Sequence, residues 1–105
     1  MKALLTISTA LVFSVSSTVF AQGYPVKTLQ ASAVICFDFS DWRDMVAASI
    51  DQDLAAASRL VSSGACRVVP DSTRVAYIDK AAGNFGSIIQ MPSGKTAFTS
   101  DAFLK

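Results

Sequence analysis

Two cysteines, Cys36 and Cys66, are the residues of this chain with the most definite chemistry. The first 21 residues have the pattern of an export signal, and an even number of thiols in a small exported chain predicts a disulfide and not reactive free cysteines. Their spacing excludes a CxxC redox pair, in which two neighbouring sulfurs tune each other's reactivity. We therefore expect a structural bond that closes a loop of about 30 residues and contributes roughly 3 to 4 kcal/mol to stability.

The other residues offer little for catalysis or for metal binding. The chain has no His and no Glu, so the commonest general base and the usual partner of Ser and Cys nucleophiles are missing. Pairs of Asp could act as acid and base, but that mechanism needs a cleft that desolvates one carboxyl group. Two sulfurs without His do not complete a tetrahedral zinc site. We predict a protein that is not an enzyme and that uses no metal or other cofactor.

Three further features resemble ligand sites and are better explained by local structure. Ser93-Gly94-Lys95-Thr96 matches the end of a phosphate-binding loop, but the upstream Gly is absent and the context is a hairpin. Asp51 and Asp53 lack the dense ligand spacing of a calcium-binding loop, so helix capping accounts for them. Trp42, the only tryptophan, is assigned to the core side of an amphipathic helix.

The first 21 residues have the three parts of an export signal. Lys2 supplies a positive end, residues 3–20 an apolar stretch diluted by Ser and Thr, and Val19-Phe20-Ala21 the small-x-small pattern. We expect cleavage between Ala21 and Gln22. The alternative is a retained membrane anchor, which seven hydroxyl residues and the lack of a following basic cluster disfavour. The mature protein is therefore expected to be periplasmic or secreted.

The mature chain, residues 22–105, is long enough for one domain only. Residues 22–33 are expected to be a flexible lead-in, and residues 34–105 a single small α+β domain. All eight acids are Asp, and eight Lys and Arg remain once Lys2 is removed, so the mature net charge is near zero. Such a chain lacks the basic stripe that binds nucleic acid or an anionic membrane. Nothing in it specifies an oligomeric state.

The clearest helical pattern begins at Ser40 and Asp41, which are the predicted N-caps. Apolar residues then recur three and four apart, as one buried face requires; they are Trp42, Met45, Val46, Ile50, Leu54, Ala57, Leu60 and Val61. Asp51-Gln52-Asp53 favours caps over a helix interior, so the pattern predicts either one long helix or two helices with a break there. Gly64 supplies the left-handed residue that ends many helices.

After Gly64 the apolar period changes to two, which is typical of strands. Four short β-type runs, residues 67–69, 74–78, 85–91 and 96–99, are separated by turn residues and predict a small antiparallel meander. Residues 34–39 predict either a further strand or an apolar approach to the helical segment. A terminal turn over residues 101–104 is expected to plug the sheet with Phe103. A bond from Cys36 to Cys66 would join both halves into one core.

Three sheet aromatics, Tyr77, Phe85 and Phe98, form the candidate ligand face, which would suit an extended peptide or a glycan. Packing in the core is the competing role for each of them.

Residues 64–105 carry Gly-Ala-Cys, then Pro-Asp-Ser-Thr-Arg-Val, then Ser-Gly-Lys before Ala-Phe-Thr. This series resembles the small SH3-like β-barrels of bacterial envelope proteins. The chain is also similar to small exported proteobacterial proteins in which a short helical segment and a first Cys precede such a unit. The resemblance implies a helical segment packed on a small SH3-like meander or barrel. Bacterial SH3-like modules often have Trp where this chain has Phe98, so the resemblance implies an architecture and no ligand site.

Together these features predict a small exported, non-catalytic binding module of the cell envelope, with a protein or a cell-wall ligand as its partner. The alternative is a periplasmic inhibitor or immunity-type protein that blocks an enzyme partner by surface complementarity. An enzyme that relies on Asp residues ranks third.

Overall fold

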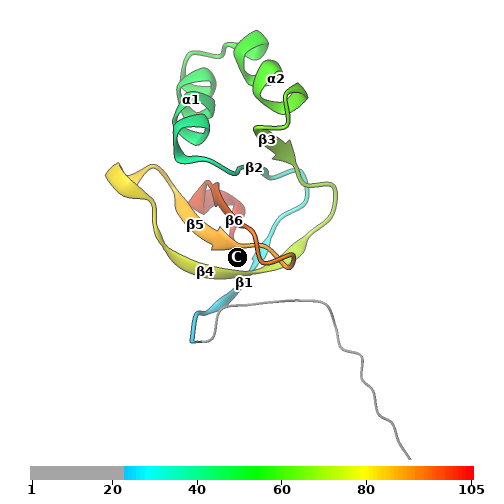
Figure 1. The fold of residues 1–105 in the computed structure, drawn as a ribbon, viewed down its shortest axis with the longest axis vertical. Coiled ribbons are helices and arrows are strands. Elements are labelled where there is room, and N and C mark those ends of the chain that lie inside the picture. Colours follow the sequence, from blue (N-terminus) through cyan, green and yellow to red (C-terminus); the bar gives the residue numbers. More distant parts are fainter. Residues whose placement is uncertain (1–22) are drawn as a thin grey trace, which may run out of the picture.

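The computed structural model describes residues 23–105 and shows an α+β protein, in which two helices lie against one face of a curled antiparallel sheet (Figure 1). The predicted fold class is therefore confirmed at this level. The predicted export signal and its cleavage site between Ala21 and Gln22 lie outside the described residues. No helix in residues 23–105 is long and apolar enough to cross a membrane.

Six strands form the sheet, which curls into a half-barrel with the order β1-β4-β5-β6-β2-β3. Their bounds are Val26–Leu29 for β1, Val34–Cys36 for β2, Cys66–Val68 for β3, Thr73–Lys80 for β4, Ser87–Gln90 for β5 and Thr96–Thr99 for β6. The meander β4-β5-β6 confirms the hairpins predicted for the C-terminal half. The run that becomes β3 does not join that meander as expected. It pairs with β2 instead, because the helices return the chain to the point where it left the sheet.

The lead-in predicted for residues 22–33 contains the first strand of the sheet. β1 pairs with β4 over its full length, and the side chain of Leu29 is completely buried. The C-terminus covers the other edge of β1, where the backbone N–H groups of Thr28 and Lys105 each donate to the other's carbonyl oxygen at 2.9 Å. The folded unit thus includes the chain from Val26 onward. So short a strand, with one fully buried residue, has too little apolar pattern to be recognised in a sequence.

The segment between β2 and β3 forms two helices, α1 (Phe39–Ile50) and α2 (Leu54–Ser62). The break has the predicted cause: Gln52 adopts a left-handed φ of 56°, and the Asp53 carboxylate accepts the backbone N–H of Ala56 at 3.0 Å. Of the two alternatives, the broken helix is confirmed. Gly64, with a φ of 86°, follows the last turn of α2 as predicted.

The predicted N-caps of α1 are wrong by two to three residues. The N-cap is Asp38, which makes no side-chain capping bond. Helical hydrogen bonding already starts there, because the backbone N–H of Trp42 donates to the carbonyl of Asp38 at 3.0 Å. Ser40 and Asp41 therefore lie inside the first turn, where a negative charge still favours the helix.

The sheet separates two apolar clusters, one on each face. The inner core consists of Leu29, Ala33, Ile35, Val69, Val75, Ile89 and Ala97, and Phe103 of the terminal turn (Asp101–Phe103) packs against it as predicted. The outer core lies between the sheet and the helices, and consists of Cys36, Trp42, Met45 and Cys66 with partly buried neighbours that include Phe98. Because successive strand residues point to opposite faces, Ile89 faces the inner core while Phe98 faces the outer one.

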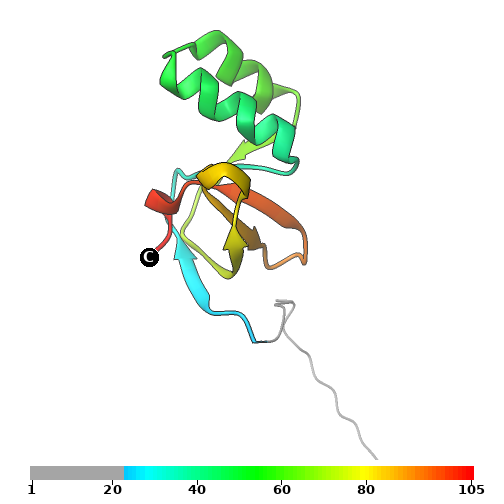
Figure 2. The same cartoon turned by 90° about the vertical axis from the view of Figure 1, so that its left-hand side faces the viewer.

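The predicted disulfide joins Cys36 to Cys66, which lie directly opposite each other in the β2–β3 pair. Both cysteines are buried in the outer core. The bond therefore closes the base of the chain segment that carries α1 and α2. We call this segment, residues 38–63, the helical hairpin; Figure 2 shows it at one end of the molecule, with β1 toward the other.

Candidate functional site

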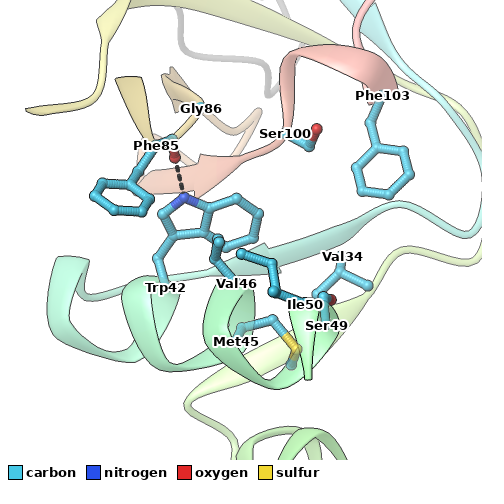
Figure 3. A pocket seen from close by; sticks show the side chains of 10 residues that line it. All are labelled: Val34, Trp42, Met45, Val46, Ser49, Ile50, Phe85, Gly86, Ser100 and Phe103. Carbon is cyan, nitrogen blue, oxygen red and sulfur yellow. Dashed lines mark hydrogen bonds between the residues drawn. The ribbon is translucent and has the colours of Figure 1, made fainter. Parts of the chain in front are cut away.

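A groove runs along α1 where this helix faces the start of β5 and the chain after β6 (Figure 3). Its volume is about 370 Å³, at the lower end of the ~300 to 1,000 Å³ found for small-molecule sites. The helix contributes Trp42, Met45, Val46, Ser49 and Ile50, and the opposite side contributes Val34, Phe85, Gly86, Ser100 and Phe103. None of these residues carries a charge. We call this recess the α1 groove.

The groove exists because α1 has a wider apolar surface than the sheet covers. Trp42, Met45 and Ala48, spaced three apart, are the buried residues of the helix. Val46 and Ile50 are four apart and lie on the neighbouring arc of the helix surface. Both line the groove, and 74% of Ile50 is exposed. Part of the apolar face of α1 is thus left without a partner among residues 23–105.

Trp42 fixes one end of the groove by joining α1 to the loop before β5. Its indole N–H donates to the carbonyl oxygen of Phe85 (Figure 3). The next residue, Gly86, has a φ of 103°, and a Cβ there would collide with the Thr99 carbonyl oxygen and lie 3.3 Å from the indole ring. Only glycine therefore allows the three segments to approach this closely. Trp42 is 4% exposed, which confirms its predicted core position.

The candidate ligand face of Tyr77, Phe85 and Phe98 is not one surface. Tyr77 is opposite Ile89 and Phe98 is opposite Ile88 in neighbouring pairs of strands, so their side chains point to opposite faces of the sheet. Phe98 packs against the outer core. Phe85 lies before β5, is 38% exposed and lines the α1 groove. The residue types alone could not predict on which face each aromatic ring lies, because a shift of one residue in strand register moves a side chain to the opposite face of the sheet.

Tyr77 borders a smaller polar pocket of about 190 Å³. The ammonium of Lys27 lies 4.8 Å from the centre of the tyrosine ring, and the hydroxyl of Ser87 donates to the carboxylate of Asp101. Ser87 is almost fully buried, and the chain has no His that could serve as its general base. Its bond to Asp101 holds the terminal turn against β5.

The remaining sequence motifs have structural roles. The Ser93-Gly94-Lys95-Thr96 motif lies in the β5–β6 hairpin, where the N–H of Met91 donates to the Lys95 carbonyl at 2.8 Å. Asp53 caps α2. Within residues 23–105, no three side chains of His, Cys, Asp or Glu are grouped so that they could hold a metal ion.

The sequence pattern placed Val46 and Ile50 on the buried face of the helix and so missed the groove. The signal was present in the width of the apolar arc, since these two residues extend the arc beyond Trp42, Met45 and Ala48. A narrower arc would have been covered by the sheet alone.

No protein-family model matches the chain, and no curated protein or solved structure matches it either.

Proposed function

We propose that this chain is a small exported, non-catalytic binding module of the cell envelope with an SH3-like sheet, and that it holds part of a protein or cell-wall ligand in the α1 groove. The observation that carries the proposal is the groove itself, an uncharged recess rimmed by the exposed side chains of Ile50 and Phe85. Exposed apolar residues grouped beside a recess are a common mark of binding sites.

The groove favours an uncharged group with an apolar part. A charged group would lose its hydration there without meeting an opposite charge, because the lining contains no Lys, Arg or Asp. Ser49 and Ser100 supply hydroxyls; that of Ser100 accepts the N–H of Ala102 at 3.2 Å and can still donate. Suitable occupants are an aliphatic or aromatic side chain of a protein, or an uncharged peptide portion of a cell-wall polymer.

Export and the absence of catalysis are supported by the sequence. The signal pattern that ends at Ala21 directs the chain across a membrane, and a buried disulfide suits an oxidising compartment. We therefore place the mature protein in the periplasm or the medium. The lack of His and Glu leaves no ordinary acid–base pair for catalysis.

Trp42 makes the proposal directly measurable, because the only tryptophan of the chain lines the groove. The exported protein is titrated with soluble cell-wall fragments and with uncharged apolar peptides while its fluorescence is followed. Sedimentation with insoluble cell wall is measured in parallel. We expect a saturable change in fluorescence with at least one of these ligand classes.

Two variants locate the binding. Val46→Asp places an unpaired carboxylate in the groove and should weaken binding at least tenfold, whereas Val68→Asp, at a 46% exposed position of β3 outside the groove, should bind like the wild type. Circular dichroism checks that both variants fold. The proposal fails if the wild type binds neither class, or if both variants lose binding equally.

The alternative is a periplasmic inhibitor or immunity-type protein that acts on an enzyme partner. The turn between α1 and α2 favours it, because Ile50 and Leu54 are 74% and 80% exposed there. A protruding apolar element held at its base by a disulfide loses little freedom when it enters a partner's cleft. A toxin or hydrolase gene beside the gene for this chain would favour this alternative.

A further inference from the structure

The charges of this protein are divided between its two parts. The helical hairpin contains five Asp and two Arg, a net charge of −3. The rest of residues 23–105 contains six Lys and Arg and three Asp, a net charge of +3. The overall charge near zero thus conceals an acidic helical end and a basic sheet. If the positive and negative residues were evenly mixed along the chain, neither part would produce an electrostatic field of one sign.

The most exposed apolar residues lie at the end of the acidic half. We call residues 50–54, between the two helices, the hairpin tip. Ile50 and Leu54 bound the tip and are the two most exposed large apolar residues of residues 23–105. Asp51 and Asp53 stand between them, and both are exposed. Two apolar side chains with two carboxylates between them are therefore presented together to the surroundings.

Internal contacts account for only part of this arrangement. Asp53 caps α2 through one carboxylate oxygen, but within the described residues no cation pairs with Asp51 or Asp53. None of the residues of α2 is fully buried, so the sheet does not need Leu54 for its own core. The disulfide at the base of the hairpin ties this tip to the body of the protein.

We infer that the hairpin tip is a docking surface for a protein partner that presents an apolar cleft with a basic rim. Ile50 and Leu54 would fill the cleft, and the carboxylates of Asp51 and Asp53 would face the rim. Charge complementarity selects this partner, since opposite charges speed encounter and like charges reject the wrong surface. An anionic membrane is repelled by the same carboxylates. This surface adjoins the α1 groove and shares Ile50 with it, but it extends beyond the groove, because Asp51, Asp53 and Leu54 do not line the groove.

The test uses two synthetic amphipathic peptides of equal length, one built from Leu and Lys and the other from Leu and Glu. Each is titrated into the exported, isotope-labelled protein, and backbone NMR shifts are followed at low and high salt. We expect the Lys peptide to bind at least tenfold more tightly than the Glu peptide at low salt. Raising the salt to 0.5 M, about three times the ionic strength of the cell, should weaken binding of the Lys peptide at least fivefold. The shifts should centre on residues 50–54.

Variants assign the contribution of each feature. Leu54→Ser and Asp51→Lys should each weaken binding of the Lys peptide at least fivefold. The matched controls are Val68→Ser and Asp71→Lys, which make similar changes at exposed positions outside the hairpin and should change affinity less than twofold. Ultracentrifugation of the protein alone shows whether the hairpin tip binds the basic sheet of a second copy in place of the partner.

Several results would overturn the inference. It fails if the two peptides bind with equal affinity, or if the NMR shifts centre on the sheet or on the α1 groove. It also fails if the hairpin variants and the control variants lose affinity equally, or if the protein alone forms concentration-dependent dimers that Leu54→Ser abolishes. Loss of groove binding in Val46→Asp, with peptide binding at the tip intact, would separate this inference from the proposed function.

Discussion

Gly86 shows how one residue permits the contact between helix and sheet. Its backbone is left-handed, which a side chain disfavours. The Thr99 carbonyl and the indole of Trp42 also lie too close to leave room for a Cβ. The bond from Trp42 to the carbonyl of Phe85 depends on the same approach. The sequence marked this glycine only as one of five. What makes it special is a neighbour 13 positions away in β6.

We predict that Gly86→Ala lowers the free energy of unfolding by about 2 to 4 kcal/mol, because backbone strain adds to a collision with backbone atoms that cannot yield. Urea unfolding followed by the fluorescence of Trp42 measures this. Gly64→Ala is the matched control: Gly64 also has a positive φ but no atom within 4 Å of the added Cβ, so only the strain of about 1 to 2 kcal/mol remains. Equal losses at both glycines would contradict the explanation.

At the scale of elements, the break between α1 and α2 follows local chemistry while β1 does not. Asp53 offers its carboxylate to the start of α2, and this preference of Asp is visible in any sequence. β1 is recognisable only once β4 and the C-terminus are placed on either side of it. A lone strand of four residues has no backbone hydrogen bonds of its own, so its neighbours decide whether it forms.

We predict that Asp53→Ala destabilises the protein by about 1 kcal/mol, since α2 loses the bond to its first turn. The change is measured as a shift in the midpoint of urea unfolding. Asp51→Ala, two residues earlier, removes an equal charge but no capping bond, and should cost less than about 0.5 kcal/mol. If the two variants behave alike, charge and not capping determines the effect.

At the scale of the whole fold, the sheet of residues 23–105 is a half-barrel with an apolar core on each face, and the disulfide lies where the helical hairpin joins this sheet. Cys36 and Cys66 border the hairpin in the sequence and lie together in the outer core. The bond therefore fixes the base of the helical hairpin, which carries the α1 side of the groove and the hairpin tip. A domain of this size buries a modest share of its surface, so one cross-link contributes much of its stability.

We predict that the double variant Cys36→Ala, Cys66→Ala loses roughly 3 to 4 kcal/mol of unfolding free energy, because the unfolded chain regains the freedom of an open loop of 30 residues. Urea unfolding measures the loss, and the oxidised wild type is the reference. Mass spectrometry of the exported wild type should show a chain that starts at Gln22 and lacks two hydrogens. A full-length product with two reactive thiols would contradict both the export and the bond.

The sequence by itself determined the α+β class, the C-terminal hairpins and the pairing of the only two cysteines, because turn chemistry and thiol count act over a few residues or leave one choice. For the helical segment it left two alternatives, one long helix or two helices with a break at residues 51–53, and the structure decided for the break. Only the tertiary structure decided that β1 belongs to the sheet, that Tyr77 and Phe98 face opposite ways, and that Val46 and Ile50 border a groove. These features depend on strand register and on how much of α1 the sheet covers. Both are set by contacts between residues far apart in the chain, where a shift of one residue changes the face that a side chain occupies.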